Sequence, residues 1–171
     1  MEKKLILTEK EIAEICKKLG AEITKTLQNS PKIPVVVGVM KGSMNFMMDL
    51  VRNIDMPIFT DYIQISSYNG TASSGKVQLV KDLSFDCQNR DVVIVEDIID
   101  TGLTMAQMLE DLKRFEPKQV IVVSLFSKKA RRTVDVQIDY SCFDIPDYFI
   151  VGYGLDYDQL YRNLPAIYVK E

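Results

Sequence analysis

The chain has 171 residues, 47% of them hydrophobic, so it is long enough to bury a core within one domain. It contains no histidine, which excludes imidazole as a general base or metal ligand, and its net charge of −3 argues against a general nucleic-acid binder. We therefore expect a small-molecule ligand handled by Asp, Glu, Lys and Tyr side chains. The three cysteines are widely spaced and no apolar run approaches the ~20 residues of a membrane span, so we expect a cytoplasmic protein.

The first part of the chain predicts a helix, a strand and a second helix. Thr8 and Glu11 have the spacing of a capping box, and apolar residues then recur at helical spacing as far as Leu27. The β-branched run 35–39 predicts a strand, and the turn 41–43 separates it from a second helical pattern.

The following segments continue this alternation. Strands are predicted at 58–66, 91–95 and 120–126, with a helix over 104–115. The polar stretch 67–76 is rich in turn formers and too long for a tight hairpin, so we expect a flexible loop there. Apolar strands separated by helices predict one α/β domain with a mainly parallel central sheet flanked by helices. Its ligand site should lie beyond the carboxyl ends of the strands.

The most informative segment is the acidic end of the third predicted strand. The strand leads into Glu96 and Asp97 and then into a polar turn that opens a helix, Asp100-Thr101-Gly102-Leu103-Thr104. The backbone N–H groups and the helix dipole at such a turn can cradle a phosphate. Carboxylates beside that cradle would repel a polyanion unless they bind ribose hydroxyls, hold Mg²⁺ or take a proton, so the segment indicates a sugar phosphate. The alternative is a plain acidic turn in which Asp100 or Thr104 caps the next helix.

On these residues the chain resembles the type I phosphoribosyltransferase family, in the bacterial form of its hypoxanthine-guanine branch. Segment 93–102 is similar to the family's phosphoribosyl-pyrophosphate motif. Four further segments match in order along nearly the whole chain: Val39-Met40-Lys41-Gly42, Ser66-Ser67-Tyr68, Ser127-Lys128-Lys129 and the run from Phe149 to Tyr157. The resemblance implies the type I phosphoribosyltransferase fold in one domain, residues 1–171. A small hood lobe would come from about 140–171, with the N-terminus as a candidate contributor.

The resemblance also implies an enzyme of purine salvage. It would transfer the 5-phosphoribosyl group from phosphoribosyl pyrophosphate to N9 of hypoxanthine or guanine, giving IMP or GMP and pyrophosphate. Mg²⁺ would be its cofactor and would support the departure of pyrophosphate. Nucleic acid and membrane are not expected partners, whereas a homodimer or homotetramer is expected.

For the phosphoribosyl group, the resemblance implies that Glu96 and Asp97 bind the ribose hydroxyls, directly or through Mg²⁺. Residues 100–104 would wrap the 5′-phosphate. Leu103 stands where some relatives carry a basic residue, which leaves a phosphate contact by this side chain open. Asp100 would handle the proton at purine N7, a task that a carboxylate can perform in a chain without histidine.

For pyrophosphate, the resemblance implies contacts from Lys41 and Gly42, in a turn whose cis peptide in the family would here be Met40–Lys41. Arg162 would be a further contact, and Asp156 would hold a second Mg²⁺ on the far side of pyrophosphate. Without the family, Lys41 is an ordinary exposed lysine in a turn.

For the base, the resemblance implies that Lys128 donates to the exocyclic oxygen of the purine, that Phe149 stacks on the ring and that Ile150 offers backbone atoms. Ser67 and Tyr68 open a loop that would close over the site and exclude water.

The local pattern leaves alternatives for these base-binding residues. Lys128 belongs to a basic run as far as Arg132 that could be a solvated surface, and the register could slip to Lys129. Phe149 lies in an apolar run typical of a buried strand, which favours the core for it.

Three rival functions remain open at this point. One is a xanthine- or adenine-preferring phosphoribosyltransferase, against which Lys128 favours a 6-oxopurine. Another is a non-catalytic nucleotide-sensing regulator on the same fold, against which the acidic balance counts. The third is a receiver-type signalling domain, whose acids would be spread over different strand ends and would not need Thr-Gly-x-Thr at a helix start.

Overall fold

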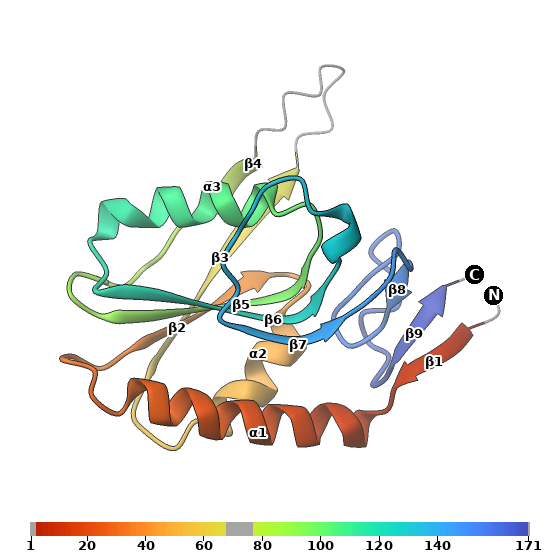
Figure 1. Cartoon of the computed structure of the whole chain (residues 1–171), viewed down its shortest axis with the longest axis horizontal. Coiled ribbons are helices and arrows are strands. Elements are labelled where there is room, and N and C mark those ends of the chain that lie inside the picture. Colours follow the sequence, from red (N-terminus) through yellow and green to blue (C-terminus); the bar gives the residue numbers. More distant parts are fainter. Residues whose placement is uncertain (1–2, 68–76, 171) are drawn as a thin grey trace.

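The main sheet of the computed structural model, which describes residues 3–67 and 77–170, has six strands in the order β4-β3-β2-β5-β6-β7 (Figure 1). Every neighbouring pair is parallel except β3 and β4. The mainly parallel sheet predicted from the alternation is therefore confirmed, whereas β4 and β7 were not among the predicted strands. The bounds are β2 (Val35–Met40), β3 (Phe59–Ser67), β4 (Val77–Lys81), β5 (Asp91–Ile99), β6 (Gln119–Ser127) and β7 (Tyr140–Asp144).

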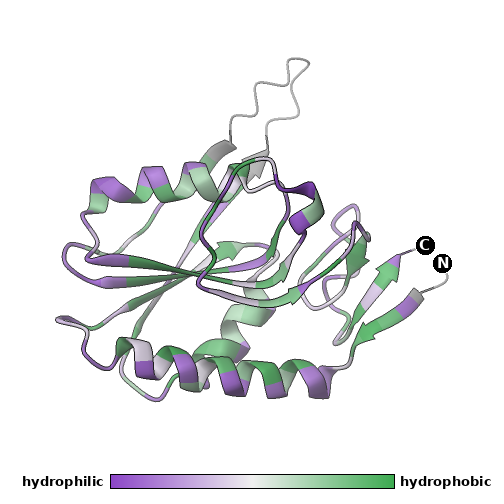
Figure 2. Cartoon of the chain, in the orientation of Figure 1, coloured by the Kyte–Doolittle hydropathy of each residue, from purple (hydrophilic) through white to green (hydrophobic). Residues whose placement is uncertain are grey.

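Helices cover both faces of this sheet (Figure 1). On one face lie α1 (Glu9–Leu27) and α2 (Met44–Val51), and on the other lies α3 (Leu103–Leu112), which continues as the 3-10 turn η1 (Lys113–Phe115). Figure 2 shows that the covered strands are mostly apolar and that α1 alternates between apolar and polar residues, as a helix with one buried face must. The predicted capping box of Thr8 and Glu11 is confirmed at the start of α1.

A second, smaller sheet joins the two ends of the chain. In the described part of the chain it has three antiparallel strands in the order β1-β9-β8, with bounds β1 (Lys3–Leu7), β9 (Ile167–Lys170) and β8 (Ile150–Val151). We call this sheet, together with the segment 152–166 that joins β8 to β9, the small lobe. The N-terminal strand thus contributes to the small lobe. From the C-terminal part of the chain, the small sheet takes strands from Ile150 onward, whereas β7 pairs with β6 in the main sheet.

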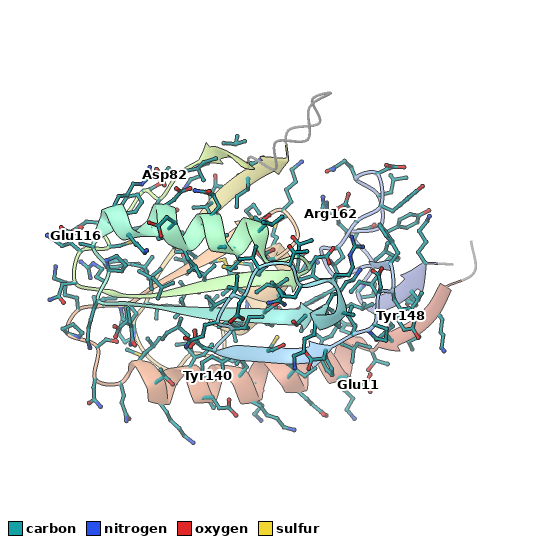
Figure 3. The ribbon with its side chains drawn as sticks, turned by 45° about the horizontal axis from the view of Figure 1, so that its top comes forward. Glu11, Asp82, Glu116, Tyr140, Tyr148 and Arg162 are labelled. Carbon is teal, nitrogen blue, oxygen red and sulfur yellow. The ribbon has the colours of Figure 1, made fainter. Side chains whose placement is uncertain are left out.

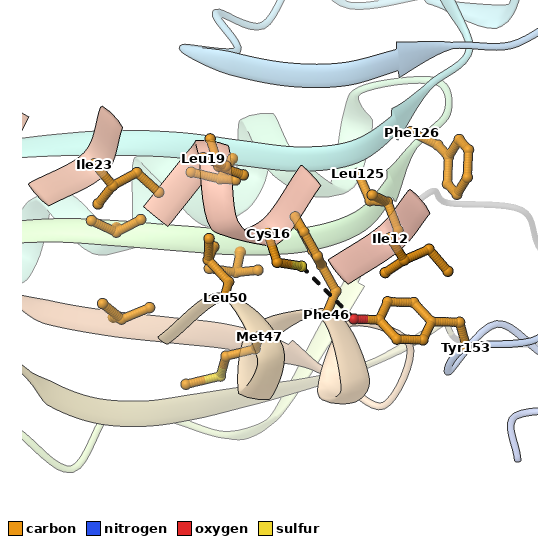
Figure 4. Close-up of a cluster of buried hydrophobic side chains, with 14 of the residues drawn as sticks. Ile12, Cys16, Leu19, Ile23, Phe46, Met47, Leu50, Leu125, Phe126 and Tyr153 are labelled. Atoms are coloured by element: carbon orange, nitrogen blue, oxygen red, sulfur yellow. Dashed lines mark hydrogen bonds between the residues drawn. The ribbon is translucent and has the colours of Figure 1, made fainter. Parts of the chain in front are cut away.

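One side chain from the small lobe packs into the core on the α1 and α2 side of the main sheet. The ring of Tyr153 lies among buried residues of both helices, and its hydroxyl is 4.0 Å from Sγ of Cys16 (Figure 4). The same hydroxyl is 2.6 Å from Oδ2 of Asp49 on α2. The small lobe is therefore attached to the main lobe by buried apolar and polar contacts.

The chain order makes β2 and β5 the switch point of the sheet. From β2 the chain passes through α2 to β3 on one side, and from β5 it passes through α3 to β6 on the other side. In open α/β sheets, ligands bind in the crevice at the carboxyl ends of such a strand pair. A ligand site is therefore expected at the segments that follow β2 and β5. None of the helices between residues 3 and 170 that the structure describes could cross a membrane.

Candidate active site

Two adjacent carboxyl groups stand near the carboxyl end of β5. Asp97 is buried at 8% exposure and Glu96 is half-buried. Burial raises the pKa of Glu96 well above its usual value, and the negative charge of Asp97 adds to this effect. Burial also raises the pKa of Asp97, against the backbone N–H of Ile98, which donates to its Oδ1 at 2.8 Å. Two carboxyl groups so close and so little hydrated need a proton or a cation between them.

The turn after β2 packs directly on this acidic pair. A Cβ atom on Gly42 would lie 1.8 Å from Oδ2 of Asp97, so any larger residue would displace the turn or the carboxylate. Gly154 of the small lobe in turn covers Gly42, because a Cβ on Gly154 would lie 2.2 Å from the Gly42 carbonyl oxygen. The peptide bond between Met40 and Lys41 is cis, as the family resemblance implies.

A pocket of about 280 Å³ opens between these segments and the start of α3. Its lining contains the acidic pair, Gly42, Asp100, Thr101, Gly102 and Thr104, together with apolar side chains from β2, β3 and α3. Leu103, by contrast, is 48% exposed and does not line this pocket. The predicted phosphate turn and the predicted ribose carboxylates thus share one cavity at the switch point of the sheet.

The backbone of the phosphate turn is held by the segment after β6. Gly102 has a φ of 87° at the N-cap of α3, and a Cβ there would lie 2.7 Å from the Val134 carbonyl oxygen. Nε of Arg132 donates to the Asp100 carbonyl oxygen at 3.1 Å, and the N–H of Thr133 donates to the carbonyl oxygen of Thr101 at 2.9 Å. The turn is therefore fixed before any ligand binds, with the N-terminus of α3 at the pocket.

Lys128 and Lys129 have different surroundings. Lys128 is only 7% exposed, and its Nζ lies 3.2 Å from Oδ1 of Asp147. The side chain of Lys129 is 75% exposed and pairs with Asp144 at 2.5 Å. The solvated-surface alternative therefore fits Lys129 and does not fit Lys128. Burying an ammonium group costs desolvation free energy, even next to a carboxylate, so such a group is typical of a binding site.

Arg131 links the carboxylate of Asp100 to Asp147, the partner of Lys128. Oδ1 of Asp100 lies 3.1 Å from Nε of Arg131, as an ion pair without hydrogen-bond geometry. Arg131 belongs to η2 (Lys129–Arg131), the short 3-10 turn after β6. Its Nη1 also donates to Asp147 at 3.2 Å. Asp100 and Lys128 are thus connected by ion pairs through Arg131 and Asp147.

The aromatic residue expected to stack on a base is accessible. Phe149 is 49% exposed, so the local expectation of a core position is wrong, because the buried strand starts one residue later at Ile150. Tyr157 meets Phe149 edge-to-face with ring centroids 5.6 Å apart. Nζ of Lys170 lies 3.4 Å from the centroid of the Tyr157 ring. These contacts hold the exposed Phe149 ring in place.

Arg162 and Asp156 form an ion pair on the small lobe. Nη2 of Arg162 lies 2.7 Å from Oδ1 of Asp156, and the N–H of Gln159 donates to Oδ2 at 2.8 Å, so both carboxylate oxygens have partners. Nη1 of Arg162 donates to the Gly154 carbonyl oxygen at 2.6 Å. Its Nε is buried without a hydrogen-bond partner among the described residues. Figure 3 labels Arg162 where the small lobe faces the strand ends.

The donor set fits Mg²⁺ at one of the two expected places. Glu96 and Asp97 are neighbouring carboxyl groups with raised pKa values, and hard oxygen donors are what Mg²⁺ prefers. Asp156 is already engaged by Arg162, so it would have to leave that pair to bind a metal. In the described ranges, no three His, Cys, Asp or Glu side chains cluster as a metal site, so any bound Mg²⁺ would take further ligands from water or substrate.

Some expected site residues are not tested by this geometry, and others were not predicted. Tyr68 and most of the predicted loop 67–76 lie outside the described residues, as does the side chain of Ser67. Arg131, Asp147 and Gly154 were missed. The two charged residues lie on short irregular segments with no motif spacing, and their role becomes visible only through contacts between segments.

The chain is similar to known phosphoribosyltransferases in sequence and in fold. The family model described as phosphoribosyl transferase domain matches residues 4–158. A hypoxanthine-guanine phosphoribosyltransferase of Staphylococcus aureus (strain Mu50) is 46% identical over 96% of this chain and 92% of its own length. The crystal structure of a hypoxanthine-guanine phosphoribosyltransferase from Bacillus anthracis superposes with a TM-score of 0.93 at 38% identity, covering 100% of both chains. A Trypanosoma cruzi hypoxanthine phosphoribosyltransferase, solved in complex with the product IMP, has a TM-score of 0.92 at 35% identity, covering 99% of this chain and 94% of its own.

Proposed function

Because the chain belongs to the phosphoribosyl transferase domain family, we propose that it transfers the 5-phosphoribosyl group of phosphoribosyl pyrophosphate to N9 of hypoxanthine or guanine. The products are IMP or GMP and pyrophosphate, and the reaction serves purine salvage. One observation carries the proposal. A single cavity at the switch point combines a carboxyl pair with the N-terminal turn of α3, and ion pairs through Arg131 and Asp147 connect Asp100 in its lining to the buried Lys128.

The phosphoribosyl group would occupy the pocket between β2, β5 and α3. Residues 100–104 bind its 5′-phosphate through backbone N–H groups at the start of α3 and through the hydroxyls of Thr101 and Thr104. Glu96 and Asp97 bind the ribose hydroxyls, either directly or through Mg²⁺. The clamp that Arg132 places on the turn supports this assignment, because a preformed anion site needs little reorganisation on binding.

The purine would lie between this pocket and the side chains of Phe149 and Lys128. Phe149 stacks on the ring, Ile150 offers backbone atoms to the base edge, and Nζ of Lys128 donates to the exocyclic oxygen that hypoxanthine and guanine share. The burial of Lys128 supports this role, since a buried donor rejects a base that cannot accept from it.

The leaving pyrophosphate would be bound by the turn after β2 and by Arg162. The backbone of Lys41 and Gly42 contacts it. The Nε of Arg162, which is buried with no hydrogen-bond partner in the described part of the chain, supports a contact from the small lobe. Glu96 and Asp97 would hold Mg²⁺, whose positive charge would offset the negative charge of pyrophosphate. Asp156 would bind a second Mg²⁺ once it leaves its pair with Arg162.

In the reaction, the bond between N9 and the anomeric carbon forms while the bond from that carbon to the pyrophosphate oxygen breaks. The purine loses one proton, which Asp100 accepts at N7. The pyrophosphate carries the negative charge away. Positive charge develops on the ribose ring, so water must be excluded from the site, a task that we assign to the loop opened by Ser67 and Tyr68.

We extend the proposal to the organisation of the protein. Residues 1–171 form one domain, and the small sheet acts as a hood over the base and pyrophosphate. The protein acts in the cytoplasm as a homodimer or homotetramer, in line with the closed symmetry of most soluble oligomers.

The test is nucleotide formation from phosphoribosyl pyrophosphate with hypoxanthine, guanine, xanthine and adenine in turn, each with Mg²⁺ and with the metal chelated. Turnover of hypoxanthine or guanine that disappears on chelation is the expected result. Preferred turnover of xanthine would assign a different substrate. Binding of phosphoribosyl pyrophosphate without turnover of any base would overturn the proposal in favour of a nucleotide-sensing role.

A further inference from the structure

Four charged side chains in a row connect Asp100, which we assign to the N7 proton, to Lys128, which we assign to the base. Asp100 pairs with Nε of Arg131 at 3.1 Å, Nη1 of Arg131 donates to Asp147 at 3.2 Å, and Asp147 accepts from Nζ of Lys128 at 3.2 Å. The charges alternate in sign along this set. Two of its members, Arg131 and Asp147, have no role in the function proposed above.

The backbone holds Arg131 at this place. Arg131 is the last residue of η2, and its backbone N–H donates to the Lys128 carbonyl oxygen at 3.1 Å. The N–H of Lys128 donates in turn to the Ile99 carbonyl oxygen at 3.0 Å, next to Asp100. The following residue, Arg132, donates to Oγ of Ser127 at 2.8 Å. Arg131 therefore projects from a fixed turn, although its own side chain is 46% exposed.

The ion pairs keep the two middle members of this set charged. Hydrogen bonds from Arg131 and Lys128 hold the pKa of Asp147 below its usual value. The hydrogen bond with Asp147 and the charge of Asp100 raise the pKa of Arg131 further above its already high value. Asp147 is thus a permanent anion that anchors both cations at neutral pH.

The two end members of this set are the groups that we assign to one edge of a purine. N7 and the oxygen on C6 are neighbouring acceptors on the same edge of a 6-oxopurine. A group that takes the N7 proton and a group that donates to the oxygen must therefore stand side by side. Asp100 and Lys128 are these two end members, and Arg131 and Asp147 connect them through ion pairs.

We propose that Arg131 and Asp147 are positioning residues of the purine pocket, which orient Asp100 towards N7 and Lys128 towards the exocyclic oxygen. This inference rests on the proposed function and adds a coupling to it. Arg131 contacts the carboxylates of both Asp100 and Asp147. When a base accepts a hydrogen bond from Lys128, the pair between Lys128 and Asp147 weakens and the ion pair between Asp147 and Arg131 becomes stronger. Arg131 then loosens from Asp100, which becomes free to accept the N7 proton. A 6-amino base places a donor against Lys128 and cannot trigger this exchange.

The first test compares Arg131→Gln with Lys129→Gln, its matched control from the same turn. Lys129 pairs with Asp144 outside the pocket, so Lys129→Gln should keep wild-type kinetics. Arg131→Gln should lower kcat with hypoxanthine by roughly 10- to 100-fold, because a misplaced catalytic group costs that much. The KM for phosphoribosyl pyrophosphate should stay within about twofold, since Arg131 does not line the phosphoribosyl pocket.

The second test asks whether Asp147 acts through Lys128. Asp147→Asn alone should reduce the preference for hypoxanthine over adenine. In a Lys128→Ala background the same change should have no further effect on this preference, because the group it orients is gone. Thermal unfolding of every variant separates these effects from loss of folding. Additive effects of the two changes would overturn the role of Asp147.

The outcomes distinguish this inference from the function on which it rests. A wild-type protein without turnover of any base removes the proposed function and the inference together. A wild-type protein that forms IMP, with Arg131→Gln kinetically equal to Lys129→Gln, leaves the function intact and overturns the inference alone. Selective loss of kcat in Arg131→Gln supports it.

Discussion

The phenol oxygen of Tyr153, on the small lobe, lies 2.6 Å from Oδ2 of Asp49 on α2. Burial and the hydrogen bond to Asp49 raise the pKa of Tyr153, so the phenol stays protonated and donates to the carboxylate. Tyr153 stands between Gly152 and Gly154, both with positive φ, and Gly154 packs on the carbonyl oxygen of Gly42. One hydrogen bond therefore helps to fix the small lobe over the turn that we assign to pyrophosphate.

Tyr153→Phe should lower stability moderately and weaken binding of phosphoribosyl pyrophosphate. Asp49 is 41% exposed, so water can replace the lost donor and the cost should be about 1 kcal/mol, or roughly 2–4 °C in Tm. Thermal unfolding and the KM for phosphoribosyl pyrophosphate measure the two effects. Tyr62→Phe is the control, since Tyr62 is 45% exposed and lies on the main sheet. An unchanged KM in Tyr153→Phe would show that the tether does not reach the site.

Gly42→Ala should abolish most activity while the protein still folds. The new methyl group would lie 1.8 Å from Oδ2 of Asp97, so either the turn or the carboxylate must move. A shift of about 1 Å at a binding group costs roughly 100-fold in turnover. Steady-state kinetics with far-UV circular dichroism test this, with the exposed Met44→Ala on α2 as control. Wild-type turnover in Gly42→Ala would mean that the acidic pair is not held by this turn.

The sequence allowed good predictions where function depends on neighbours in the chain. The strand that begins at residue 91, the carboxyl pair near its end and the turn at the start of α3 follow from hydrophobic pattern and turn chemistry, which are local properties. The strand itself runs to Ile99 and contains the pair, four residues beyond the predicted end. The mainly parallel sheet follows from the alternation of strands with helices, and the capping box of α1 from two residues three positions apart.

Contacts between distant segments could not be predicted in the same way. Asp147 reaches Lys128 across 19 positions, and Tyr153 reaches Asp49 across 104. Phe149 was placed in the core by its apolar neighbours, yet it is half exposed because the strand begins only at Ile150. Pattern alone cannot fix where a strand starts or which charges meet, since both depend on the packing of the two lobes.

Asp61 should make the fold sensitive to acid. It is buried on β3, and it accepts from Nζ of Lys81 at 2.8 Å and from the N–H of Ser84 at 2.6 Å. Burial opposes the charged form, but these hydrogen bonds and a further one from Tyr62 outweigh it and lower the pKa of Asp61 below its ordinary value of 3.8. Its stabilising contribution is therefore complete above pH 3.8 and is lost as the pH falls through the lower folded-state value.

Asp61→Asn should cost about 1–3 kcal/mol at neutral pH, because the amide turns one acceptor into a donor that faces Lys81 or Ser84. The cost should shrink as the pH falls, since the wild-type protein loses the same interaction in acid. Urea unfolding between pH 7 and pH 3 measures both effects, with the exposed Asp55→Asn as control. A pH-independent difference between wild type and Asp61→Asn would contradict the assignment.

Lys128→Ala should blur the choice of base. Without the buried ammonium, the pocket loses the donor to the exocyclic oxygen, and the preference for hypoxanthine over adenine should fall by roughly 10- to 100-fold. Competition assays that contain both bases measure the ratio directly. Lys129→Ala should leave the ratio unchanged, because that side chain is exposed and paired with Asp144. If Lys128→Ala and Lys129→Ala changed the ratio equally, the loss of positive charge would explain the effect, and a specific contact from Lys128 to the base would not be needed.

Asp100→Asn should lower turnover far more than it weakens substrate binding. A group that accepts a proton acts mainly in the transition state, so its loss appears in kcat, by roughly 100-fold or more, while both KM values change little. The amide keeps the size of the carboxylate and leaves in place the bond between Arg132 and the backbone carbonyl of residue 100, so the phosphate turn should keep its shape. Single-turnover kinetics with saturating phosphoribosyl pyrophosphate isolate the chemical step from product release. If Asp100→Asn turned over at the wild-type rate in that experiment, the N7 proton would have to leave by another route, and water in the pocket would be the next group to test.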